Sequence, residues 1–194
     1  MSKKKSAQVM KEIPYSARAL LRHSYDQAIT HAARLASFAA SPLLAEMGVL
    51  EDRQNELAMG DLISLSLHLR RLLELSNTGD FVRTNSVEAV RNGKKTMIPI
   101  TTIVNKVIHH QRLDILRRQS DYMAAPEHTD EALAAWMKAR QVGLYPLFAV
   151  QADSGGLIGL RFAEFVVAAY RGIVRPIVDY CDDRQFYLED LDVD

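Results

Sequence analysis

The residues of this chain most able to do chemistry are Asn105 and His109, which stand four apart in a stretch otherwise rich in Ile and Val. Residues four apart share one face of an α-helix, so the amide and the imidazole would lie side by side. An imidazole gives or takes a proton near neutral pH, and a neighbouring amide can orient it or hold a ligand. The pair predicts part of a phosphodiester-binding or nuclease site. The alternative is structural, with Asn105 bridging helices and His109 a satisfied buried histidine.

Basic side chains elsewhere in the sequence would suit phosphate binding around this pair. The candidate binding residues are His110, Arg112, Arg70 and Arg71, with Lys94, Lys95, Arg117 and Arg118 in the same basic set. Lys and Arg side chains that neutralise phosphates supply most of the non-specific affinity for nucleic acid. Aromatic side chains that would stack on bases are scarce, and Phe81 and Tyr122 are the nearest. A solvated basic surface is therefore the alternative.

Four segments have apolar residues three and four apart, the spacing of amphipathic helices. They are predicted to run from Pro14 to about Phe38, from about Leu50 to Ser76, from Pro99 to about His110, and from about Leu157 to Tyr180. The third is rich in β-branched residues, which leaves a strand as its alternative, although its apolar spacing favours a helix. Residues 86–90 are expected to form a helical turn.

Two further stretches, residues 113–117 and 144–151, alternate apolar and polar side chains with the period of a β-strand. Between them, Thr129 can cap a short amphipathic helix that contains Trp136. An isolated hairpin is only marginally stable, so this pair of strands must pack on the helices. The predicted fold is mainly α: a four-helix up-and-down bundle with a small antiparallel β-hairpin arm, at about 112–152, that carries the short helix.

Length and composition indicate one globular domain, predicted over residues 13–181 between a flexible basic tail at 1–12 and an acidic tail at 182–194. The 24 basic and 24 acidic side chains cancel, so overall charge does not indicate a nucleic-acid partner. A single cysteine, Cys181, fits a reducing compartment, and the two acids that follow it predict an inert thiol. The most apolar segment, 157–178, carries four charged residues. We therefore expect a cytoplasmic protein with no membrane association.

Histidines on three predicted helices raise the question of a metal site. His31, His68 and His109 lie on different helices, and Asp61 stands seven residues before His68. A helical bundle can converge such ligands on a metal ion. No helix, however, carries a His-x-x-x-His or Glu-x-x-His pair. The sequence therefore predicts no metal and no cofactor.

The order of the predicted helices and the Asn-x-x-x-His step in a short third helix resemble the HEPN superfamily (higher eukaryote and prokaryote nucleotide-binding domains). The resemblance implies a four-helix bundle that is commonly dimeric. In ribonuclease members it implies an Arg about four to six residues before the His, often followed directly by Asn. Here the Asn and His positions fall on Asn105 and His109, and the Arg position falls on Val104. A substitute cation would have to come from elsewhere, such as the helix of Arg70 and Arg71, or from a dimer partner.

The resemblance and the missing Arg lead to one function and two alternatives. The first is a non-catalytic HEPN-like module that binds a partner protein, a nucleotide or RNA in a bacterial stress or defence setting. The second is a metal-independent endoribonuclease that uses His109, oriented by Asn105, with an Arg borrowed in space. The third is a structural protein that acts by assembly alone. In each case we expect a homodimer or a stable complex with a partner protein.

Overall fold

The computed structural model describes residues 15–40, 48–76, 78, 85–91, 94–116, 146–153 and 156–188. The elements follow in the order α1 Tyr15–Ala40, α2 Gly48–Ser76, β1 Ser86–Arg91, β2 Lys94–Pro99, α4 Ile100–Ile108, β3 His110–Leu116, β4 Leu147–Ala152, β5 Ile158–Arg161, α7 Phe162–Ala169, a π-helical turn Tyr170–Val174, and α8 Arg175–Asp182. The predicted N-terminal tail and the short helix after Thr129 lie outside the described residues.

The five strands form one antiparallel sheet in the order β2-β1-β5-β4-β3. The edge strands β2 and β3 are joined in sequence by α4 alone, so the chain crosses the sheet from one edge to the other through this helix. In doing so, α4 packs against β4 on one side and against α2 on the other. This crossing fixes where the residues at the C-terminal end of α4 lie.

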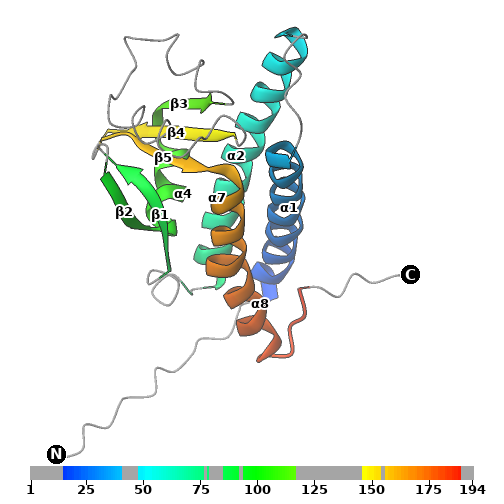
Figure 1. The fold of residues 1–194 in the computed structure, drawn as a ribbon. Coiled ribbons are helices and arrows are strands. Elements are labelled where there is room, and N and C mark those ends of the chain that lie inside the picture. The colour runs from blue at the N-terminus through cyan, green and yellow to red at the C-terminus, as the bar shows by residue number, and fades with distance from the viewer. Residues whose placement is uncertain are drawn as a thin grey trace, which may run out of the picture.

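The helices cover one face of the sheet in two tiers. Figure 1 shows the sheet on the left, α1 on the right, and α7 between them. Helices α4 and α7 contact the strands directly, and the long pair α1 and α2 packs behind them. Four phenylalanines, Phe38, Phe148, Phe162 and Phe165, meet where α1, the sheet and α7 converge, with ring centroids 5.1–5.3 Å apart. One continuous apolar core therefore joins sheet and helices.

The seams predicted for the two long helices are confirmed. In α1, Leu21, Ala28 and Leu35 are fully buried at seven-residue intervals, as a helix packed along its length requires. In α2, Leu62 and Leu69 are likewise fully buried and seven residues apart. None of the described helices is both long enough and apolar enough to cross a membrane.

The prediction of a mainly helical protein with four helices is confirmed, but the sheet has five strands where a two-stranded arm was expected. The two predicted strands exist and pair as β3 and β4. Residues 86–90 form strand β1, so the expected helical turn was wrong, and the last helix begins at Phe162 because residues 158–161 form β5. Strand β5 lies in the middle of the sheet with three of its four residues buried. A strand buried on both faces shows no alternation, so its apolar run resembles the start of a buried helix.

The π-helical turn in the last helix has a local cause at Pro176. Proline has no N–H, so it cannot donate to the carbonyl oxygen of Gly172 four residues earlier. The side chain of Asn85, just before β1, donates its Nδ2–H to that carbonyl oxygen at 3.1 Å. A Cβ at position 172 would approach the Asn85 Cβ to 3.2 Å, so glycine suits this close approach. Asn85 thereby ties β1 to the irregular part of the last helix.

The chain turns back after α8 and packs against α1. The Phe186 N–H donates to the Cys181 carbonyl at 3.0 Å, and Arg22 of α1 donates to the Tyr187 carbonyl at 3.1 Å. Leu188, only 1 % exposed, joins the core. Residues 182–188 of the segment expected to be an acidic tail are thus in contact with the folded domain.

Replacing Asn85 with alanine is expected to lower the free energy of unfolding by about 1 kcal/mol, because the Gly172 carbonyl loses its side-chain donor in a partly buried position. Urea denaturation of Asn85→Ala against the unchanged protein measures this. The matched control is Ser86→Ala, at the adjacent exposed position, which should stay within about 0.5 kcal/mol. Equal stability of the two variants would show that the hydrogen bond from Asn85 to Gly172 does not contribute to the free energy of unfolding.

Candidate functional site

The end of α4 presents Asn105 and His109 at the surface. The buried face of α4, which includes Ile103 and Val107, holds the helix against α2 and the sheet. Asn105 is exposed on the opposite face. His109 caps the helix, and its backbone N–H donates to the Asn105 carbonyl at 3.0 Å. The helical spacing predicted for this pair is therefore present, and both side chains are accessible to a ligand.

Val104, at the position where the resembled motif has an Arg, is 1 % exposed and lies in the core. A guanidinium there would be buried among apolar side chains, at a cost of several kcal/mol. The side chain at position 104 therefore points into the core, whereas His109 is exposed to solvent. A cation for this site has to come from another element.

Arg70 of α2 lies beside His109 at the surface. Its Nη1 is 3.0 Å from Nε2 of His109, and its Nε donates to Oε1 of Glu74 at 2.8 Å. A guanidinium has only donors, so Nε2 of His109 accepts this hydrogen bond, and the ring proton of the neutral imidazole stands on Nδ1. Arg70 thus forms hydrogen bonds to both the Glu74 carboxylate and the His109 imidazole. We refer to Arg70 and His109, with Asn105 on the same helix as His109, as the Arg70–His109 site.

The other three candidate binding residues, His110, Arg112 and Arg71, are not placed in described contact with His109. Nδ1 of His110 lies 2.7 Å from the Val107 carbonyl, so this ring donates to the backbone. Arg112 pairs with Asp114 on the same strand. Arg71 is exposed, and its charge acts on His68 of α2. Of the sequence candidates, the described contacts bring together Arg70 and His109.

Sequence analysis missed a cluster of three histidines between α1 and α2. His31 and His68 stack with ring centroids 6.0 Å apart, and His23 meets His68 edge-on at 5.9 Å. Burial, followed by the charges of His31, His23 and Arg71, lowers the pKa of His68 below its ordinary value of 6.5. The signal was available, because His23 and His31 stand eight apart on one face of α1. We call these three residues the histidine cluster.

No group of three or more His, Cys, Asp or Glu side chains within the described ranges could hold a metal ion. His109, expected beside His31 and His68 in the metal hypothesis, lies instead against Arg70.

A groove of about 530 Å³ lies between β1 and the last helix, apart from both histidine-bearing regions. Among its described lining residues, Val167 and Ile100 are apolar, and Glu164 and Arg171 are charged. Glu164 pairs with Arg161 at 3.4 Å. None of the described lining residues belongs to the Arg70–His109 site.

The chain matches no protein-family model, no curated protein and no solved structure.

Cys181 is expected to remain unmodified by a thiol reagent such as 5,5′-dithiobis(2-nitrobenzoic acid) at pH 8 while the protein is folded. The side chain is fully buried, and burial, together with Asp182, raises the pKa of the thiol to about 12. Unfolding in urea should release about one equivalent of reactive thiol, measured at 412 nm. A fast stoichiometric reaction of the native protein would contradict the buried position of Cys181.

Proposed function

We propose that this chain is an RNA-binding module that holds a backbone phosphate at the Arg70–His109 site, and that it is related to the HEPN superfamily. The observation that carries the proposal is the 3.0 Å contact between the Arg70 guanidinium and the His109 imidazole. It supplies, from α2, the cation that the motif on α4 lacks. The N–H groups of an Arg guanidinium form strong charge-assisted hydrogen bonds to phosphate oxygens.

The hydrogen bonds of Arg70 leave room for such a ligand. Glu74 engages Nε and His109 engages Nη1, so within the described contacts Nη2 is available to an incoming oxygen. The Arg70 side chain is 42 % exposed, which lets a nucleic-acid backbone approach from solvent. Neither described contact needs to break for a phosphate to bind.

A metal-independent ribonuclease is the second candidate, and the same contact favours it. In the structure the lone pair on Nε2 of neutral His109 accepts a hydrogen bond from Arg70, so His109 would act as the base once that bond is exchanged for the RNA 2′-hydroxyl. Nε2 would then take the hydroxyl proton as that oxygen attacks the adjacent phosphorus. The P–O5′ bond then breaks, the leaving 5′-oxygen takes up a proton from water, and a 2′,3′-cyclic phosphate remains. Arg70 would stabilise the charge that develops on the phosphate oxygens, and Asn105 would orient the imidazole.

Replacing Arg70 with alanine should weaken binding of a fluorescein-labelled single-stranded RNA about tenfold, because a charge-assisted phosphate contact is lost. The slope of log Kd against log salt should fall by about one. Fluorescence anisotropy titrations over a series of salt concentrations measure both the Kd and this slope. Arg53→Ala is the matched control, since Arg53 also pairs with a glutamate of its own helix, Glu56, in a more exposed position near the other end of α2. Equal affinities of the two variants would refute the binding site.

The ribonuclease candidate predicts cleavage of RNA in the presence of EDTA, with 2′,3′-cyclic phosphate ends. His109→Gln should abolish cleavage, and Arg70→Ala should slow it about 10²–10³-fold, as loss of an oxyanion-stabilising group does. Gel analysis of end-labelled RNA, with a substrate carrying a single 2′-deoxy at the cut, measures the rate. If RNA binding depends on Arg70 but no RNA is cleaved, the RNA-binding proposal stands and the ribonuclease candidate is wrong.

A further inference from the structure

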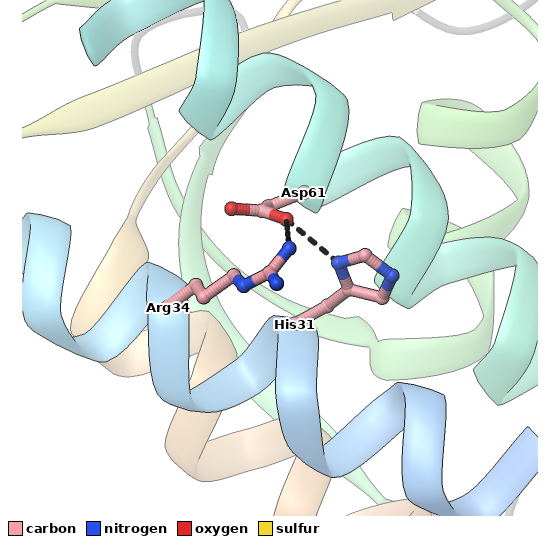
Figure 2. A network of polar contacts seen from close by, with 3 residues as sticks. All are labelled: His31, Arg34 and Asp61. Atoms are coloured by element: carbon pink, nitrogen blue, oxygen red, sulfur yellow. Dashed lines mark hydrogen bonds and ion pairs between the residues drawn. The ribbon is translucent and has the colours of Figure 1, made fainter.

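Within the histidine cluster, His31 and His68 differ in their hydrogen bonding. Figure 2 shows His31 and Arg34 of α1 both directed at the Asp61 carboxylate of α2. Nδ1 of His31 lies 2.7 Å from Oδ1 of Asp61, and Nη1 of Arg34 lies 3.6 Å from the same oxygen. His31 therefore keeps an acceptor whether or not it carries a second proton. This ion pair joins the two helices at any pH at which Asp61 is ionised.

His68 has no such acceptor. Its Nδ1 is buried and has no hydrogen-bond partner among the described residues. In a neutral ring with its proton on Nε2, that buried nitrogen carries only a lone pair. In a protonated ring both nitrogens carry protons, and Nδ1–H becomes a buried donor with nothing to accept it. Leaving a buried donor unpaired is costly, and more so when the group is charged.

The charged and titratable groups that face His68 also oppose a proton there. They are His31 and His23 from α1 and Arg71 from α2, and each lowers the pKa of His68 in addition to burial. The Asp61 carboxylate, which lies beside the histidine cluster, is engaged by His31 and Arg34. A proton on His68 thus meets two imidazoles across the α1–α2 interface and the Arg71 guanidinium on its own helix, with no described counter-charge of its own.

We propose that His68 is an acid-sensitive latch: taking up a proton, it turns its ring out to water and opens the packing of α1 against α2 locally. The orphaned Nδ1 and the three facing basic side chains carry this inference. It is independent of the RNA-binding proposal, because Arg70 and His109 take no part in it. The sealed position of Nδ1 requires that the ring moves before water can solvate it.

The direction of the pH effect follows from the lowered pKa of His68. The opened form, with an ordinary pKa near 6.5, binds the proton before the closed form does. The stabilisation of the α1–α2 packing is therefore complete above about pH 6.5 and is lost as pH falls through the lower pKa of the closed form. Because one proton is involved, the opening constant should rise about tenfold per pH unit inside that window.

Amide hydrogen exchange of α1, followed by mass spectrometry of peptides within residues 15–40, tests the latch between pH 7.5 and 5.0. This range lies above the ordinary titration of carboxylates. After correction for intrinsic exchange rates, protection of α1 should fall by up to about tenfold per pH unit below pH 6.5. In His68→Gln, which cannot take up the proton, protection should stay constant within about twofold over the same range.

Two further variants make the result decisive. His109→Gln, which removes an exposed imidazole outside the cluster, should retain the full pH dependence. His23→Gln changes an exposed position and removes one of the repelling rings, so it should fold even if His68→Gln does not and should show a smaller loss of protection. A pH-dependent loss in His68→Gln as large as in the unchanged protein would overturn the proposal. So would flat protection of α1 in the unchanged protein, or a His23→Gln variant with an undiminished loss.

Discussion

The placement of α4 between α2 and the sheet is the constraint on which the rest of the structure depends. Because α4 alone connects the two edge strands, it must cross the sheet. As it does so, its apolar residues are buried between α2 and the strands. The direction of that crossing brings the end of the helix to α2. His109 meets Arg70 there, thirty-nine residues earlier in the chain. The contact is thus a consequence of how the core packs, and the short spacing within α4 alone would not produce it.

The same packing explains why the cation of the site stands on α2. Position 104 faces the core at 1 % exposure, where valine contributes to apolar burial and a charge would need a buried partner. On α2, Arg70 lies at the boundary between core and solvent, where its stem can pack and its head can stay hydrated. Glu74, one turn further along α2, accepts a hydrogen bond from Nε of Arg70, and Nη1 of Arg70 donates to His109.

Long amphipathic elements could be predicted from sequence, because their burial repeats along one face. This held for the helices α1, α2 and α4. Strands β3 and β4 were also predicted from the sequence, although burial does not alternate along them and the first four residues of β4 are all buried. Strands β1 and β5 were missed for a physical reason. In β1, two consecutive residues, Ala89 and Val90, are buried, and in β5 nearly every residue is, so neither has a clear period of two. Of the site, spacing indicated that Asn105 and His109 share a face. The proximity of Arg70 and the grouping of His23 with His68 depend on tertiary packing that local periodicity does not encode.

Helix α2 carries both polar regions, and a buried stripe separates them. His68 and Arg71 belong to the side that meets the histidine cluster of α1, whereas Arg70 and Glu74 belong to the side near the end of α4. Leu69 and Leu72, both fully buried, lie between these sides and pack in the core. A change at the α1 interface therefore reaches Arg70 only if α2 moves as a body. Because α2 is also held by α4 and β3, local opening of α1 leaves the partners of Arg70 in place. The acid response that we infer and the phosphate site that we propose are thus separable properties of one helix.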